Sequence, residues 1–556
     1  MNTKAPINRI SAITALLLGV CASSALAQQQ NQFSWGLSSD TQGITLTNNT
    51  PPGITTITTK NGNAKGRIEI TNNRQQNNAL SSLLIQTGAS IEGNMGLIVV
   101  GQNGSYTIPT ITNQGTLITN GHPTIHIKET GNKTITNFTN SGTIKNKKQN
   151  NKNNNENSAI RFNEGGGTYF VSNFTNSNSG LIKANKRAMA LYNTTITSFT
   201  NEGTIESNEN NAIFLKDSQI KTFINKGLIK SKSKSNDSTE TIKLWSGTSV
   251  DVFFNSSTIM AQEGSSAGVY LETDENGNKS INIKTLENTG LIQAQGPAVH
   301  VGIAVTTEGN GITLLKNSGT LISSKGDGIQ VNNDSSLANI SKNGSQDKIS
   351  TTSRIMTLQN SGLIQGNGDG VRVFYDCTAE YCNDEGKSSI GTINNTGTII
   401  GTTGAGIAIR LQRDDSGGDK GIKSTFMTVD KVKVDGLVQG KQAGILNQGQ
   451  LGSKEGEEAI IVGTNGRIQG GFKNDKDGIL QGDITNNGKS ELALDNKGKV
   501  SNNTVITNSN SSNGGSIKIL DWKVENQSNG QQPQQPNGKI KTVQFKGQGI
   551  TVEKLT

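Results

Sequence analysis

Two aspartates at equivalent positions in neighbouring repeats are the residues best placed for metal chemistry. Asp327 and Asp369 each precede a glycine and an apolar-x-apolar phrase. If these phrases stack as adjacent strands, the carboxylates come to about 5 Å from each other, which costs free energy unless a cation or a lysine intervenes. Carboxylate oxygens suit Ca²⁺, although both residues could equally be exposed turn residues. Because Pro297 and Ala405 occupy the flanking repeats, we expect no metal or other cofactor, with this pair as the weak candidate.

Two serine-containing segments match the spacing of hydrolase motifs. Gly264–Gly268 (GSSAG) has the spacing of a nucleophile elbow, which requires a strand-turn-helix setting followed by Asp and His. Asp414–Asp419 (DDSGGD) is similar to the serine region of chymotrypsin-like proteases. The whole chain has only three histidines, His122, His126 and His300. We therefore expect no Ser/His/Asp triad and no enzyme.

The N-terminal segment 1–27 has the pattern of a secretory signal. Lys4 and Arg9 give a basic start, Ile10–Val20 is apolar, and Ala25–Ala27 is a small-x-small cleavage pattern. Cleavage after Ala27 leaves Gln28 as the first residue, so we expect export through the inner membrane to the cell surface, the outer membrane or the medium.

The expected export bears on the cysteines. After removal of the signal, Cys377 and Cys382 remain, five positions apart. A close pair in an exported chain typically forms a loop disulfide, and we predict one here.

A short phrase, apolar-x-Asn-x-Gly-x-apolar, recurs down the middle of the chain. Its copies are Phe138–Ile144, Phe199–Ile205, Phe223–Ile229, Leu286–Ile292, Leu315–Leu321, Leu358–Ile364 and Ile393–Ile399. A second apolar-x-apolar phrase follows shortly after each repeat glycine, as at Ala212–Leu215. Both alternate with the period of a half-buried strand.

The spacing of the repeat glycines indicates the kind of solenoid. Gly180, Gly203 and Gly227 are the most closely spaced, and they give a minimal coil of about 23–24 residues. Other intervals are longer, so extra residues must leave the coil as loops. This pattern predicts a right-handed parallel β-helix with the extra residues leaving from one turn.

The repeated asparagines should form a ladder along the axis of this helix, because stacked strands place equivalent residues about 4.8 Å apart. The expected members are Asn140, Asn201, Asn225, Asn255, Asn288, Asn317, Asn360 and Asn395. The glycine two residues later permits a positive φ or a close backbone approach, although Ser257 replaces it in one coil.

Composition and repeats together divide the chain. Hydrophobic residues are 31% and aromatic residues 4%, which suits a thin solenoid. We expect a cap and first coils over 28–110, the regular β-helix over 111–450, drifting coils over 451–524, and a Gln/Pro linker with terminal strands over 525–556. The net charge of +9 is spread through loops, and no basic helix or stacking platform predicts nucleic-acid binding.

The signal, the Asn-x-Gly coils and the low cysteine and aromatic content resemble the passenger region of bacterial autotransporters, of the Helicobacter and Campylobacter outer-membrane repeat type. The resemblance implies a surface-exposed or released β-helix, commonly an adhesin or a toxin. Nothing after Val500 is long enough for a membrane β-barrel, so the outer-membrane translocator would be encoded outside this chain.

The expected function is therefore a non-enzymatic surface protein that adheres to a glycan or protein of host cells or matrix. Two alternatives remain open. One is a toxin passenger similar to the vacuolating cytotoxins, and the other is a polysaccharide-acting β-helix enzyme, which would need acidic and basic residues clustered on adjacent coils.

Overall fold

The computed structural model describes 32–37, 44–46, 54–59, 64–65, 68–70, 82–94, 96–101, 104–128, 130–148, 157–162, 166–232, 240–262, 267–273, 279–302, 310–334, 351–376, 386–411, 424–523 and 543–556. These residues form almost only strands. Two 3-10 turns, η3 (Ser424–Phe426) and η4 (Ser511–Asn513), interrupt them. Within the described ranges there is no α-helix, and accordingly no helix that could span a membrane.

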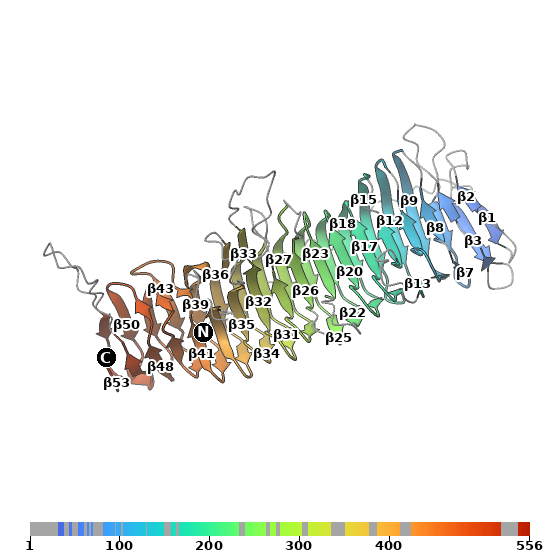
Figure 1. Ribbon diagram of the computed structural model, residues 1–556. Coiled ribbons are helices and arrows are strands. Elements are labelled where there is room, and N and C mark those ends of the chain that lie inside the picture. Colours follow the sequence, from blue (N-terminus) through green and yellow to red (C-terminus); the bar gives the residue numbers. More distant parts are fainter. Residues whose placement is uncertain are drawn as a thin grey trace, which may run out of the picture.

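The chain winds into a parallel β-helix, a long rod built from three parallel sheets (Figure 1). The fold class predicted from the repeats is thus confirmed. From Ile54 to Asn447 each coil contributes one strand to each sheet, in the order A, C, B, whereas the first described coil and the coils after Asn474 contribute none to sheet C.

Sheet A consists of β1 (Gln32–Leu37), β3 (Ile54–Thr59), β6 (Ser82–Ile85), β9 (Tyr106–Asn113), β12 (Lys133–Asn140), β15 (Tyr169–Asn176), β18 (Thr194–Asn201), β21 (Gln219–Asn225), β24 (Ser249–Asn255), β27 (Asn282–Asn288), β30 (Asn310–Asn317), β33 (Thr351–Asn360), β36 (Gly386–Asn395), β39 (Met427–Val434), β42 (Gln450–Leu451), β43 (Glu458–Val462), β46 (Ile479–Leu480), β47 (Asp483–Asn486), β49 (Lys499–Val500), β50 (Thr504–Asn508) and β52 (Val543–Lys546).

Sheet C consists of β4 (Ala64–Lys65), β7 (Ser90–Gly93), β10 (Thr116–Thr119), β13 (Thr143–Asn146), β16 (Leu181–Ala184), β19 (Thr204–Ser207), β22 (Leu228–Lys232), β25 (Thr258–Gln262), β28 (Leu291–Ala294), β31 (Thr320–Ser323), β34 (Leu363–Gly366), β37 (Thr398–Gly401), β40 (Leu437–Gly440) and β44 (Arg467–Gln469).

Sheet B consists of β2 (Ile44–Leu46), β5 (Ile68–Ile70), β8 (Ile98–Val100), β11 (Ile125–Ile127), β14 (Ile160–Phe162), β17 (Met189–Tyr192), β20 (Ile213–Lys216), β23 (Ile242–Trp245), β26 (Val269–Glu272), β29 (Val299–Val301), β32 (Ile329–Asp334), β35 (Val371–Asp376), β38 (Ala405–Leu411), β41 (Ala443–Asn447), β45 (Phe472–Asn474), β48 (Glu491–Asn496), β51 (Ser516–Trp522) and β53 (Ile550–Val552).

One continuous hydrophobic core runs along the inside of the rod, because the apolar member of each alternating pair points inward. Part of it is a column of five phenylalanines on sheet A, with neighbouring ring centroids 4.5–4.9 Å apart and nearly parallel planes. The column consists of Phe138, Phe174, Phe199, Phe223 and Phe253. Parallel register makes this stacking obligatory, since identical positions lie directly above one another.

The three connections of a coil differ in how much their length varies. From β9 to β39 the turn from sheet A to sheet C has two residues in every coil except after Asn176, where it has four. The connection from C to B is shortest between Gly440 and Ala443 and much longer between Asn146 and Ile160.

The connection from B to A varies as widely. It is a single residue between Tyr192 and Thr194, whereas it extends from Asp334 to Thr351 in a later coil. Extra residues therefore leave from two turns, not from one as the sequence led us to expect, and both turns flank sheet B.

The glycine of the A-to-C turn is required for close approach of the backbone of adjacent coils. At Gly203 a Cβ would lie 2.2 Å from the carbonyl oxygen of Gly180, and the residue has no positive φ. Where Ser257 replaces the glycine, the hydrogen bond from Thr258 N to Gly227 O lengthens to 3.3 Å. The equivalent bond one coil earlier, from Leu228 N, is 2.8 Å. Of the two explanations offered by the sequence, close approach holds here.

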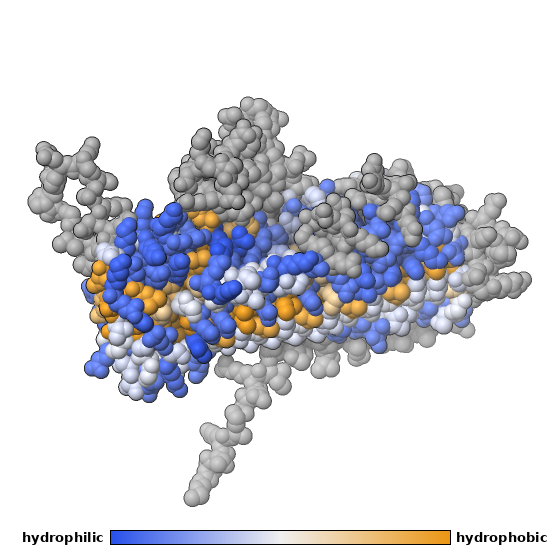
Figure 2. Space-filling view, turned by 60° about the horizontal axis from the view of Figure 1, so that its bottom comes forward, coloured by the Kyte–Doolittle hydropathy of each residue, from blue (hydrophilic) through white to orange (hydrophobic). Residues whose placement is uncertain are grey.

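The outer surfaces are mixed in polarity. On the side shown in Figure 2, hydrophobic residues lie along the axis among hydrophilic ones. Sheet C contributes partly exposed leucines such as Leu291, Leu363 and Leu437, and the register alternates them with threonines at equivalent positions. Because of this alternation, the leucines of sheet C do not form a single continuous apolar face.

Candidate functional site

A column of ten asparagines lies at the end of the sheet A strands, buried beneath the A-to-C turn. The side chains of neighbouring coils are joined by nine hydrogen bonds of 2.7–2.8 Å. The column contains the eight residues expected from the sequence together with Asn113 and Asn176. In each bond the Nδ2 of one coil donates to the Oδ1 of the next, so all the amides point the same way. At about 4.8 Å per coil the column is about 43 Å long.

The two ends of this column differ. At the N-terminal end the register places Ile85 before Asn113, and the Oδ1 of Asn113 has no hydrogen-bond partner among the described residues. At the C-terminal end Val434 follows Asn395, whose Nδ2 donates instead to the carbonyl oxygens of Gly397 and Leu437. The directional column therefore leaves one orphaned acceptor and no orphaned donor.

Asp327 and Asp369 are both buried, with 4% and 2% of their surfaces exposed, so the interpretation as exposed turn residues is wrong. The carboxylate of Asp327 accepts a hydrogen bond of 2.8 Å from the backbone N of Asp369, and that of Asp369 accepts one of 2.7 Å from Ala405 N. Each carboxylate thus tethers its coil to the next through the backbone.

Each of the two aspartates pairs with an arginine from the following coil. Arg410 makes a bidentate pair with Asp369, with distances of 2.5 and 2.6 Å, whereas Arg372 reaches Asp327 at 3.5 Å. Burial raises the pKa of Asp327, and Arg372 offsets this only in part. For Arg410, burial acts to lower the pKa, but the hydrogen bond and charge of Asp369 raise it overall. Among the described residues no group of three or more His, Cys, Asp or Glu side chains could hold a metal ion.

The outer face of sheet B carries a second cluster, composed of aromatic and cationic side chains from successive coils. The guanidinium of Arg187 lies 3.9 Å from the centre of the Phe214 ring and donates a 2.9 Å hydrogen bond to Tyr192 Oη. The Phe214 ring lies 5.5 Å from Tyr192 and 5.6 Å from Trp245, centre to centre. These aromatics form a small hydrophobic cluster outside the main core.

The same face continues through an ionic group. Lys243 Nζ lies 4.4 Å from the centre of the Trp245 ring, contacts the Glu272 carboxylate and lies 3.7 Å from Glu240. Asn211 Nδ2 donates to Glu240 Oε2 at 3.2 Å. Burial raises the pKa of Glu240 although Lys243 acts to lower it. A buried acid beside a second carboxylate is the kind of environment in which ionisable groups become functional.

His300 follows one coil further along sheet B. Its ring stacks on Tyr270 with centroids 4.3 Å apart, and its Nε2 lies 2.5 Å from Asn332 Oδ1 and 3.1 Å from Gln330 Nε2. Burial lowers the pKa of His300 to about 4, so the ring is neutral at pH 7. His300 thus lies on the wall of sheet B, away from any serine–aspartate arrangement that the structure describes.

Several predicted positions lie outside the described residues. These are Ala27 and Gln28 of the cleavage site, Cys377 and Cys382 of the expected disulfide, and the Asp414–Asp419 segment. In Gly264–Gly268 only the last two residues are described, and they lead into strand β26, not into the helix that a nucleophile elbow requires.

Sequence reasoning missed most of the sheet B cluster, although a signal for it was present. The middle residue of each apolar-x-apolar phrase points outward, and by register these residues form one row: Phe214, Lys243, Tyr270, His300, Gln330 and Arg372. Comparing only this middle residue from repeat to repeat would have shown that it is often aromatic or cationic. Asn176 was missed because its turn is two residues longer, which breaks the Asn-x-Gly spacing.

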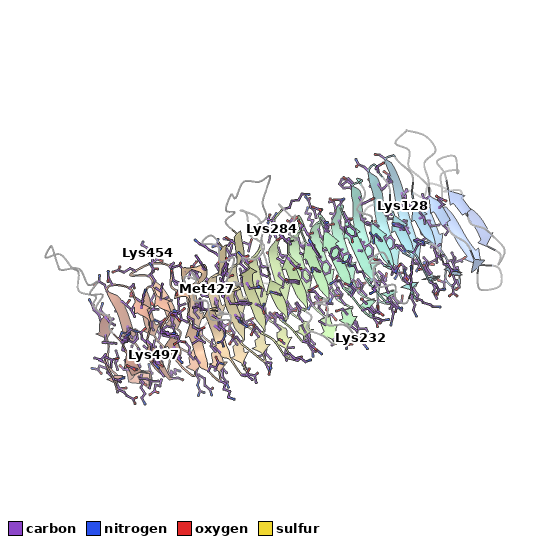
Figure 3. All side chains as sticks on the ribbon, in the orientation of Figure 1. Lys128, Lys232, Lys284, Met427, Lys454 and Lys497 are labelled. Carbon is purple, nitrogen blue, oxygen red and sulfur yellow. The ribbon has the colours of Figure 1, made fainter. Side chains whose placement is uncertain are left out.

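The remaining charge is spread out. Figure 3 labels lysines from both halves of the rod, Lys128, Lys232, Lys284, Lys454 and Lys497, which lie along its whole length. These labelled lysines are spread along the rod and do not gather at one place.

No protein-family model, no curated protein and no solved structure matches this chain. The functional argument therefore depends on the geometry described above.

Proposed function

We propose that this chain is an exported, non-enzymatic surface protein of the autotransporter-passenger type, which adheres to a host-cell or matrix component through the outer face of sheet B. The main support for the proposal is the position of the connections whose lengths vary from coil to coil. Both connections that flank sheet B vary in length, whereas the A-to-C turn is almost constant. Variable loops on a rigid scaffold are where binding function concentrates.

Two further features support the same face. Five buried ionisable groups with shifted pKa values lie on or beside sheet B strands, whereas Glu206 lies on sheet C; the five are Arg187, Glu240, His300, Asp327 and Arg410. The aromatic cluster described above is also on this face. The rest of the rod then acts as a rigid spacer, and the export expected from the segment 1–27 would display it outside the cell.

The test is binding of purified residues 28–556 to host cells and to matrix proteins, compared with an unrelated rod-shaped protein. The variant Trp245→Ala on sheet B should reduce binding, whereas Gln365→Ala, on the outer side of sheet C, should not. Binding no stronger than that of the unrelated rod would refute the adhesin proposal. Sequencing the N-terminus of the exported protein tests cleavage after Ala27.

A polysaccharide-acting enzyme is a second candidate, favoured by one observation. Glu240 is buried with a raised pKa and shares Lys243 with Glu272, and an acid of raised pKa opposite a carboxylate is the arrangement used in glycoside hydrolysis. Release of reducing ends from polysaccharides, abolished by Glu240→Gln, would establish this activity. Absence of any release over a panel of acidic and neutral polysaccharides would exclude it.

A further inference from the structure

Arg187 is a buried cation without a carboxylate partner. Only 8% of its surface is exposed, and among the described residues no Asp or Glu lies within ion-pairing distance of it. Its guanidinium is held by the Phe214 ring and by Tyr192 Oη, which leaves its Nε without a hydrogen-bond acceptor. Charged side chains are almost never this buried unless they are paired, so this donor lacks an anion.

A second unsatisfied donor belongs to the same ring cluster. Trp245 Nε1 is enclosed and has no acceptor among the residues that the structure describes, although part of the Trp245 side chain remains exposed. The Trp245 and Phe214 rings meet edge to face, with an interplanar angle of 62°. Two N–H groups thus flank one aromatic cluster, and both require an acceptor from elsewhere.

The surrounding charge favours an anion. Arg161 lies close to Arg187: its guanidinium is 5.3 Å from the centre of the Tyr192 ring, and burial, the larger cause, and the positive charge of Arg161 both act to lower the pKa of Arg187. The carboxylates of Glu240 and Glu272 are already engaged by Lys243. Among the residues that the structure describes, no carboxylate is therefore left to pair with Arg187.

We propose that this part of sheet B, over β17, β20 and β23, binds an acidic saccharide. Its carboxylate or sulfate group lies against the Arg187 guanidinium, and the two side chains turn on binding so that Arg187 Nε and Trp245 Nε1, which are covered in the unbound protein, each donate a hydrogen bond to a saccharide oxygen. The proposal deepens the proposed adhesion function, on which it rests, by naming the ligand class of the sheet B face.

A saccharide fits this site better than an acidic peptide. A peptide usually gains affinity by adding a strand to a free sheet edge, but β17, β20 and β23 are each paired on both sides. The site instead offers aromatic rings interspersed with hydrogen-bond donors, which match the apolar faces and oxygen atoms of a sugar ring. Successive coils also repeat at about 4.8 Å, which is close to the length of one hexose unit.

The experiment is calorimetric titration of purified residues 28–556 with trigalacturonic acid and with a sulfated chondroitin tetrasaccharide, which separate the carboxylate and sulfate sources. Maltotetraose serves as the neutral ligand and a glutamate-rich peptide as the acidic peptide. We expect at least one acidic saccharide to bind and neither of the other two. Trp245→Phe keeps the ring and the net charge but removes one donor, so it should weaken binding about fivefold. Arg187→Lys should weaken it about tenfold or more, because it removes a charge-assisted bond.

A matched control separates this site from diffuse attraction to a basic protein. Lys473→Met removes one charge from the outer row of sheet B far from the cluster, in β45, and should leave the affinity unchanged. Thermal unfolding of each variant verifies that the fold persists. Equal binding of maltotetraose, stronger binding of the peptide, or wild-type affinity in Trp245→Phe would each overturn the proposal.

The outcome also distinguishes the ligand class from the adhesion function. If the protein binds host cells but no acidic saccharide, and Trp245→Phe binds cells normally, the saccharide site is refuted and adhesion stands. If acidic saccharides bind while cells and matrix do not, the adhesion function fails and the saccharide site stands.

Discussion

Replacing a single asparagine in the middle of the buried column should cost more stability than the same replacement at either end. In Asn225→Val the new side chain is tolerated sterically, because Val434 occupies the equivalent place in a later coil. The cost comes instead from the loss of a buried hydrogen bond. Asn255 Oδ1 loses the donor that lay 2.7 Å away and has no other, whereas the Nδ2 of Asn201 keeps two backbone carbonyls at 3.3 and 3.4 Å.

The end replacements add no orphaned acceptor. Asn395→Val removes the last acceptor, but Asn360 Nδ2 still donates to two carbonyls at 3.1 Å each. Asn113→Val removes the unpaired Oδ1 of Asn113 but leaves the Oδ1 of Asn140 without its donor, so the number of unpaired acceptors stays the same. A buried acceptor without a donor costs about 1–3 kcal/mol, so Asn225→Val should be destabilised by about that much more than either end variant.

Hydrogen exchange measured by mass spectrometry suits this comparison, because a rod of stacked coils opens locally and a single global free energy is poorly defined for it. The acceleration of exchange over β21, β24 and β27 in Asn225→Val, relative to the wild type, should exceed the acceleration around the substituted coil of either end variant by about 5- to 150-fold. Peptides around the substituted coil of each end variant should change less, by the common effect of losing one amide. Equal acceleration in all three variants would refute the argument from orphaned acceptors.

Three other predictions follow from the same geometry. Asp369→Asn should lower the free energy of local opening around β35 and β38, measured by hydrogen exchange, by about 3–5 kcal/mol, because it leaves Arg410 without its bidentate partner. Asp327→Asn should cost less because its arginine is 3.5 Å away, and equal losses would contradict this. His300 has a folded-state pKa of about 4, below the ordinary 6.5, so the melting temperature should fall as pH decreases from about 6.5 to 4, and a slope that persists in His300→Gln would exclude it as the cause. Gly203→Ala should lower the melting temperature, because its Cβ meets a backbone oxygen at 2.2 Å; an unchanged value would show that the coils can separate at no cost.

The fold was predictable because the repeat phrase encodes it at every level. Alternating apolar residues, the asparagine and the glycine each specify one part of the coil, and parallel register multiplies their effect. Which turns vary in length was only partly readable, because the two repeat phrases suggested two strands and one variable return per coil, whereas a regular coil has three strands and two variable connections.

The sheet B cluster was harder to predict for a physical reason. Its members come from different coils, as Tyr192, Phe214 and Trp245 do, and their types are not repeated. In a repeat sequence, residue types that recur in every coil are easy to recognise, whereas residue types that occur in one coil only are easily overlooked. The burial of Asp327 and Asp369 depends likewise on arginines from following coils, whose roles appear only once the coils are stacked.

The uniform sense of the asparagine bonds has a consequence for how such a molecule can change in length over generations. Because each coil presents an acceptor below and a donor above, removing the segment that contains Asn225 would bring the Asn201 donor to the acceptor of Asn255. Duplication or loss of a whole coil by recombination between similar gene segments therefore leaves each asparagine donor facing an asparagine acceptor where the new neighbours meet. The length of the rod could then evolve in discrete steps, independently of the connections that flank sheet B.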